Sequence, residues 1–180
     1  GRDGRPGRGG SAGRAVDGRT GRRVGAGGFV EDGINRNEDG ALDTQWRFSY
    51  NQGLYIGAAV ELARVTTLDL LPAATRTALA AVETLAPEGV IAQEGSGGDE
   101  GLFKGVLYRY LGLLLARLDP DDPARQRLEA FVRTSTDALV ASAERDGELL
   151  AADDWRVGVE PPVYYSTQVS AIMALELRAA

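Results

Sequence analysis

The sequence predicts an all-α fold, namely an incomplete α/α toroid in which inner and outer helices alternate. Helical patterns follow one another from residue 50 onward, and segments that are apolar around most of their circumference alternate with amphipathic ones. Successive apolar segments begin about 50–65 residues apart, which is the period of a repeated helical hairpin. Parallel inner helices wrapped by outer ones satisfy this order, although two and a half hairpins cannot close a ring. A plain helical bundle is the alternative.

Three segments are predicted to be inner helices. Residues 50–66, 101–118 and 165–179 carry apolar side chains on nearly all faces, as expected of helices that are buried. In the first of them, Gly57 and Ala58 allow a neighbouring helix to approach closely.

Two segments are predicted to be outer helices. Residues 72–85 open with a proline, which is favoured in a first turn, and carry polar residues such as Arg76 and Glu83. Residues 123–143 space their apolar side chains between arginines and acids, which indicates a half-exposed helix. The glycine-rich stretch 89–98 is predicted to be a loop or a short hairpin.

Residues 1–28 are predicted to lie outside the fold, and residues 29–180 form the predicted domain. The first 28 residues hold 11 Gly and 7 Arg and show no hydrophobic periodicity. Such a composition is typical of a disordered leader, or of coding sequence translated out of frame; an Arg-Gly tail that binds RNA is the alternative. The leader carries a net charge of +5 and the remainder −11, which gives −6 in total. An acidic domain repels phosphates, so we expect no nucleic-acid partner.

The residue types that are missing exclude several kinds of chemistry. The chain has no His and no Cys, so it cannot form a Ser-His-Asp triad, a Cys-His pair or a His-ligated metal site. We expect no cofactor and no metal. Chemistry at neutral pH would depend on carboxylates, tyrosines and Lys104. No apolar run is long enough to predict a membrane span.

Polar side chains gather where each predicted inner helix begins. The residues concerned are Tyr50, Asn51 and Gln52, then Asp99, Glu100 and Lys104, and finally Gln168. Because parallel inner helices start at the same end, their N–H groups and polar tips would converge there and could hold sugar hydroxyls. Helix capping, and a salt bridge from Lys104 to Asp99 or Glu100, are the alternatives. Trp155 could stack on a sugar ring or fill the edge of a core.

Several short motifs resemble glycoside hydrolase family 76, the endo-α-1,6-mannanases, over about residues 29–180. They are Tyr50-Asn51-Gln52-Gly53, Ile56-Gly57-Ala58, Glu61-Leu62, Phe103-Lys104-Gly105, Arg109-Tyr110-Leu111, Asp32-Gly33, Trp155 and the run 166–171. The resemblance implies an (α/α)6 toroid, retaining hydrolysis of α-1,6-mannosidic bonds in mannan, and an extracellular or cell-envelope location, although the sequence shows no signal peptide. It also implies two adjacent catalytic aspartates, whose carboxyl groups must lie about 5–5.5 Å apart.

No adjacent pair of aspartates occurs where the resemblance would place it, before residue 50. Asp121-Asp122 directly precedes a predicted helix, and acidic side chains at this position are favoured as helix caps. Asp153-Asp154 stands beside Trp155 but lies on the wrong side of the hallmark helices. We therefore expect the catalytic pair upstream of this chain, and an inactive chain by itself.

The sequence therefore predicts part of a glycosidase that supplies the substrate-binding wall of a mannan-binding cleft. The candidate binding residues are Tyr50, Asn51, Gln52, Asp99, Glu100, Lys104, Trp155 and Gln168. The expected partner is mannan or a mannose-rich oligosaccharide, and the exposed apolar surface of an open ring predicts self-association. The alternatives are a non-catalytic glycan-binding toroid and a sugar epimerase, which would need histidine bases from elsewhere.

Overall fold

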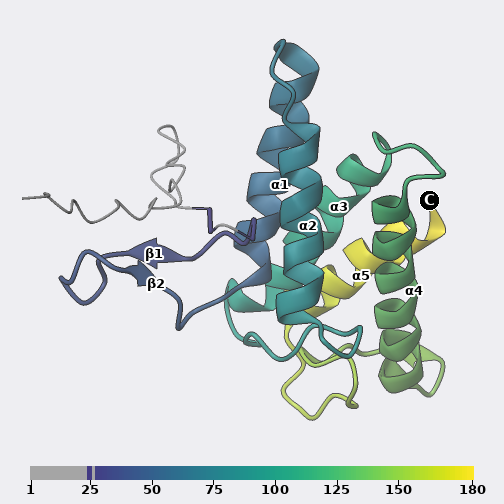
Figure 1. Cartoon of the computed structure of the whole chain (residues 1–180). Coiled ribbons are helices and arrows are strands. Elements are labelled where there is room, and N and C mark those ends of the chain that lie inside the picture. Colours follow the sequence, from purple (N-terminus) through teal and green to yellow (C-terminus); the bar gives the residue numbers. More distant parts are fainter. Residues whose placement is uncertain (1–23, 26) are drawn as a thin grey trace, which may run out of the picture.

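The computed structural model describes residues 24, 25 and 27–180, and helices dominate it (Figure 1). The helices are α1 (Ser49–Val65), α2 (Leu71–Leu85), α3 (Phe103–Leu115), α4 (Pro123–Ala143) and α5 (Tyr165–Ala179), with a 3-10 turn, η1 (Glu100–Leu102), directly before α3. The predicted all-α class and the predicted helices are confirmed, with shifts of a few residues at their ends.

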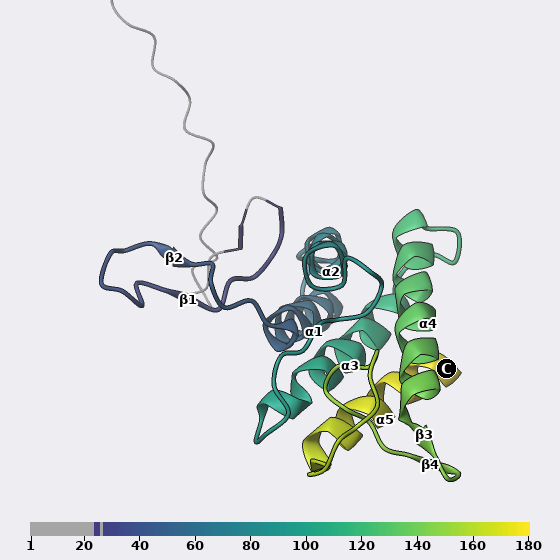
Figure 2. The ribbon, with the colours of Figure 1, turned by 90° about the horizontal axis from the view of Figure 1, so that it is seen from below.

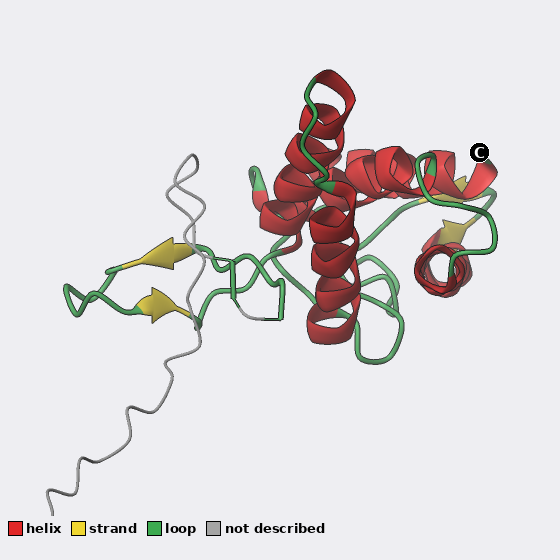
Figure 3. Cartoon of the chain, turned by 45° about the horizontal axis from the view of Figure 1, so that its top comes forward, coloured by secondary structure: helices red, strands yellow, loops and turns green. Residues whose placement is uncertain are grey.

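Two small antiparallel hairpins lie outside the helices (Figure 3). One pairs β1 (Gly33–Ile34) with β2 (Leu42–Asp43), and the other pairs β3 (Glu144–Arg145) with β4 (Glu148–Leu149). The sequence does not predict these hairpins, because two-residue strands are too short to produce an alternating pattern. The stretch 89–98 forms no strand and runs as a loop into η1.

Three helices form a row, with α3 packed between α1 and α5 (Figure 2). Helices α2 and α4 flank this row, and they also contact each other. The helices predicted to be inner are therefore those of the row, and the two amphipathic segments are the flanking ones. On α2, the residues that are buried recur at helical spacing: Ala74, Thr77, Ala78 and Ala81.

Glycines bring the helices of the row into close contact. A Cβ atom on Gly53 would lie 2.8 Å from the Cα of Leu107 in α3, and one on Gly57 would overlap the ring of Tyr110. A Cβ on Gly105 would lie 2.8 Å from the Cα of Ser170 in α5. Any larger residue at these three positions would force the helices apart.

The hydrophobic core is centred on α3. Leu107, Tyr108, Leu111 and Leu114 are fully buried there, and burying a leucine contributes about 1.5–3 kcal/mol. The ring of Tyr108 also packs against Trp155, with ring centroids 5.2 Å apart.

Within residues 27–180, the outer faces of α1 and α5 carry exposed apolar side chains. Helix α1 exposes Leu54, Leu62 and Val65, and α5 exposes Ile172. The prediction that inner helices are buried on all sides therefore holds for α3, which has a helix on either side, more fully than for α1 and α5.

The predicted leader lies mostly outside the described residues. At its end, Val24 forms an isolated β-bridge with Val30, and the hydroxyl of Thr77 donates to the carbonyl of Gly28 (2.7 Å). Among the described residues, no helix combines the length and hydropathy that a membrane crossing requires.

Candidate functional site

The N-terminal ends of α1, α3 and α5 lie at one end of the row, as the sequence predicts. At the start of α1, the backbone N–H and the hydroxyl of Ser49 donate to the carboxylate of Glu94 (2.6 and 2.5 Å), in the loop that leads to α3. In α5, the hydroxyl of Ser170 donates to the carbonyl of Gly101 (2.6 Å) and accepts from the N–H of Gly105 (3.1 Å). Side chains therefore connect all three helix tips.

A buried ion cluster lies at this junction. Lys104, in the first turn of α3, places its Nζ atom 2.6 Å from Oδ1 of Asp153 and 4.0 Å from Oε2 of Glu94. The three side chains expose only 2%, 4% and 5% of their surface, respectively. Oδ2 of Asp153 accepts from the N–H groups of Glu94 and Gly95 (2.7 and 2.8 Å). The cluster therefore fixes the loop before α3 to the loop before α5.

The cluster contains two carboxylates and one ammonium group. Burial raises the pKa of the Glu94 carboxyl, while the charge of Lys104 and the hydrogen bonds from Ser49 act in the opposite direction. The alternative pairing of Lys104 with Asp99 or Glu100 does not occur; the partners come from loops that local spacing could not reveal.

Two glutamines fix neighbouring loops through their carboxamides. Gln52 accepts from the N–H of Val30 (2.9 Å) and donates to its carbonyl (2.7 Å). Gln168 does the same with Ala151, at 3.0 and 2.9 Å. Each carboxamide therefore pairs with both backbone groups of one loop residue, as a neighbouring β-strand would. Gln52 does so at the start of α1, and Gln168 does so at the start of α5.

Tyr50 and Asn51 bind a carboxylate of the hairpin segment. The Tyr50 hydroxyl and Nδ2 of Asn51 both donate to Oδ1 of Asp32 (2.8 and 2.9 Å), and Arg36 donates to Oδ2 (2.7 Å). Oδ1 of Asn51 is buried and has no hydrogen-bond partner among the described residues. This tip therefore keeps one unused acceptor.

The remaining candidates differ in exposure. Asp99 and Glu100 are exposed at η1, whereas Trp155 exposes only 1% of its surface and belongs to the core. The rings of Phe48, Tyr50 and Phe103 pack together at the tips of α1 and α3; the last two have centroids 4.4 Å apart.

A cavity of about 380 Å³ opens beside the ion cluster. Its walls come from the two loops that Asp153 joins and from the start of α5, and they include Ser96, Asp154, Tyr164 and Thr167. Three carboxylates (Asp153, Asp154 and Glu160), several hydroxyls and a partly exposed aromatic ring suit a neutral, hydroxyl-rich ligand.

Asp154 is held differently from its neighbour Asp153. It accepts from the guanidinium of Arg156 (2.7 and 2.9 Å), which lowers the pKa of the carboxyl. Arg156 also reaches Glu88 (3.0 Å). Asp122, by contrast, accepts from the N–H of Ala124 (2.8 Å) and caps α4, as predicted.

Glu94 was not among the residues predicted from the sequence, and Asp153 was considered only as a catalytic candidate. One signal could have revealed the cluster, because Lys104 is the only lysine of the chain and stands in a helix that otherwise carries one charged residue, Arg109. A buried ammonium group requires carboxylate partners.

The chain matches the model of glycosyl hydrolase family 76 over residues 24–178. It is 43% identical to the Lin0763 protein of Listeria innocua, with a TM-score of 0.77, over 87% of this chain and 44% of that one. It is 34% identical, with a TM-score of 0.75, to an inactive double-aspartate variant of alpha-1,6-mannanase GH76A from Salegentibacter sp. in complex with alpha-1,6-mannotriose, over 85% and 46% of the two chains.

A curated relative is the mannan endo-1,6-alpha-mannosidase DCW1 of Saccharomyces cerevisiae. It is 27% identical over 120 residues, which are 63% of this chain and 26% of that protein. The chain therefore spans less than half the length of these relatives.

Proposed function

Because the chain belongs to glycosyl hydrolase family 76, we propose that it supplies the substrate-binding wall of a cleft for α-1,6-linked mannan. The complete protein would hydrolyse α-1,6-mannosidic bonds. The observation that carries this proposal is the convergence of three helix N-termini beside a hydroxyl- and carboxylate-lined cavity of about 380 Å³. The α-1,6-mannotriose complex of a 34% identical mannanase supports the choice of sugar.

We propose that the wall has two layers. Asp99, Glu100 and Tyr50 form the layer that contacts glycan, together with the cavity residues Ser96 and Tyr164. Acids and hydroxyl groups bind sugar hydroxyls well, and these side chains are at least partly exposed. The layer behind them consists of the candidates that are engaged with backbone groups, with carboxylates or with the core, namely Asn51, Gln52, Lys104, Trp155 and Gln168. This second layer orients the loops that meet the sugar.

We propose that the catalytic carboxylates come from a segment outside this chain. Asp153 uses both oxygens in the buried cluster, and Asp154 forms an ion pair with Arg156. Retaining hydrolysis requires one carboxyl group that is protonated beside another that is ionised and free to attack. Neither Asp153 nor Asp154 offers a free nucleophile.

Titration of the chain with α-1,6-mannotriose by isothermal calorimetry tests the binding role. We expect saturable binding, and weaker or no binding of maltotriose, whose linkage differs. Asp99→Asn with Glu100→Gln should weaken mannotriose binding about tenfold, as expected for the loss of hydrogen bonds to charged groups. Glu148→Gln, an exposed change in β4, is the matched control. Equal binding of both sugars, or none at millimolar concentration, would contradict the proposal.

Incubation of the pure chain with α-1,6-mannan tests the catalytic part. We expect no release of mannose oligosaccharides, because no free carboxyl pair is available. Release of such products by the chain, and its loss in Asp153→Asn, would show that our assignment of this aspartate is wrong.

We also propose that the row α1, α3, α5 is an arc of an α/α toroid and that its open sides associate. The apolar side chains exposed on α1 and α5 occupy the positions where further inner helices would pack. In sizing chromatography, the chain should elute as a concentration-dependent oligomer, and Leu62→Glu should shift it toward the monomer. A monodisperse monomer at high concentration would refute this part of the proposal.

A further inference from the structure

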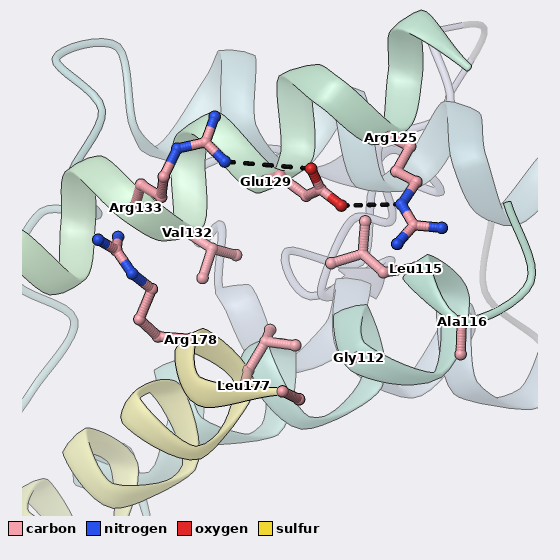
Figure 4. A pocket seen from close by; sticks show the side chains of 10 residues that line it. Gly112, Leu115, Ala116, Arg125, Glu129, Val132, Arg133, Leu177 and Arg178 are labelled. Atoms are coloured by element: carbon pink, nitrogen blue, oxygen red, sulfur yellow. Dashed lines mark hydrogen bonds and ion pairs between the residues drawn. The ribbon is translucent and has the colours of Figure 1, made fainter. Parts of the chain in front are cut away.

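A second cavity, of about 320 Å³, lies at the other end of the helix row from the proposed sugar site. It is enclosed by the last turn of α3, the first half of α4 and the last turn of α5 (Figure 4). Its floor is apolar and consists of Gly112, Leu115, Val132 and Leu177. A ligand in this cavity would therefore bury apolar surface.

Three arginines surround this floor. Arg125 and Arg133 come from α4 and Arg178 from α5, and Figure 4 shows Glu129 between the first two. Glu129 is the acidic side chain that lines the cavity, and Arg178 forms an ion pair with Asp137 (3.2 Å) and donates to the hydroxyl of Thr136 (3.3 Å). The three arginines and these two acids together carry one excess positive charge. In a chain of net charge −6, this is an unusual concentration of guanidinium groups.

The arginines keep hydrogen-bond donors available. Arg133 is 53% exposed, and its ion pair with Glu129 spans 4.0 Å, which is beyond hydrogen-bond distance. No hydrogen bond from its guanidinium occurs within the described residues. Arg125 uses Nε toward Glu129 (2.8 Å) and one amino nitrogen toward the carbonyl of Leu118 (3.0 Å). Since a guanidinium has five N–H donors, at least two arginines retain unused ones.

The position of Arg125 also favours an anion in this cavity. It lies in the first turn of α4, where the helix dipole disfavours a cation. An anion in the cavity would relieve this repulsion and would also reduce the repulsion between neighbouring guanidinium groups.

We propose that this cavity binds a small organic anion, a phosphate monoester or a carboxylate, that carries a short apolar group. The guanidinium groups would hold the anionic head at the rim, and the apolar group would lie on the leucine and valine floor. This site is independent of the proposed sugar cleft.

The test is calorimetric titration of the chain with hexyl phosphate, and with inorganic phosphate and hexanol separately. We expect hexyl phosphate to bind at a ratio of one to one, and at least about tenfold more tightly than either of the other two, because it alone uses both rim and floor. Raising the salt concentration should weaken binding of both phosphates and leave hexanol unaffected.

Arg133→Gln is the informative variant, because the side chain is half exposed and its loss should leave the fold intact by circular dichroism. We expect hexyl phosphate to bind about tenfold more weakly to it, and also to Arg178→Gln. Arg145→Gln in the exposed β3 strand is the matched control and should bind normally. Equal affinity of Arg133→Gln and Arg145→Gln would overturn the proposal. Failure of hexyl phosphate to saturate the chain at millimolar concentration, or a protein segment occupying the cavity in a crystal, would also do so.

Discussion

Replacing Lys104 by methionine would remove the only cation from the buried cluster with Asp153 and Glu94. The ammonium group lies 2.6 Å from one carboxylate and 4.0 Å from the other, and all three side chains are almost fully buried. Removing one partner of a buried pair costs about 3–5 kcal/mol, because the remaining charge has no compensation. Two carboxylates lose their cation here, so we expect the free energy of unfolding to fall by an amount in the upper half of that range near neutral pH.

The loss should depend on pH in a defined direction. Burial already raises the pKa of Glu94 in the presence of the cation, and without the cation the pKa of this carboxyl group should rise further. A group whose folded pKa is raised binds more protons in the folded than in the unfolded state between the two pKa values, so stability falls as pH rises through that window. The variant should therefore be destabilised more at pH 8 than at pH 5.

Urea unfolding followed by circular dichroism, at pH 5 and pH 8, measures both effects. Arg109→Met, at an exposed site on the same helix, is the matched control and should change the free energy of unfolding by less than about 0.5 kcal/mol. Adding Asp153→Asn to Lys104→Met should restore part of the stability by removing one uncompensated charge. If Lys104→Met lowered the free energy of unfolding by less than about 1 kcal/mol at both pH values, the ion cluster would not be buried from water as described above.

Two further predictions concern packing and surface charge. Gly105→Ala should lower the free energy of unfolding by about 1–3 kcal/mol in urea titrations, because its Cβ would press on the backbone of Ser170. Gly97→Ala, where a Cβ meets nothing within 4 Å, is the control. Equal losses of stability in the two variants would contradict this close helix contact. Asp154→Asn should reduce the stability that the pair with Arg156 contributes near neutral pH. Because the pKa of Asp154 is lowered, wild type and variant should converge as the pH falls from about 4 through the lowered pKa of the folded state, and a difference in thermal midpoint that does not shrink below about pH 4 would refute this.

The helices and their order could be predicted because hydrophobic periodicity is a local property of the chain. Residues 123–143, for example, form α4 with the predicted bounds, since a proline starts the helix, Asp122 caps it, and the apolar residues recur at helical spacing. The convergence of three polar helix tips also followed from the alternation of inner and outer helices, because parallel helices begin at the same end.

The contacts within the candidate site were harder to predict from the sequence. The sequence placed Lys104 and Gln168 at helix tips but could not show whether they faced a ligand or a loop. Lys104 meets an aspartate 49 positions away, and Gln168 binds the backbone of Ala151 through both ends of its carboxamide. Both partners lie in irregular loops, which carry no periodic signal.

The sequence by itself therefore determined the helix segments, their alternation and the family, because propensity, amphipathic pattern and short motifs are written along the chain. Only the tertiary structure decided which side chains are buried, which carboxylates neutralise Lys104, and that arginines from α4 and α5 share one cavity. The physical reason is that charge pairing and desolvation depend on distances between residues far apart in sequence, and folding alone sets those distances.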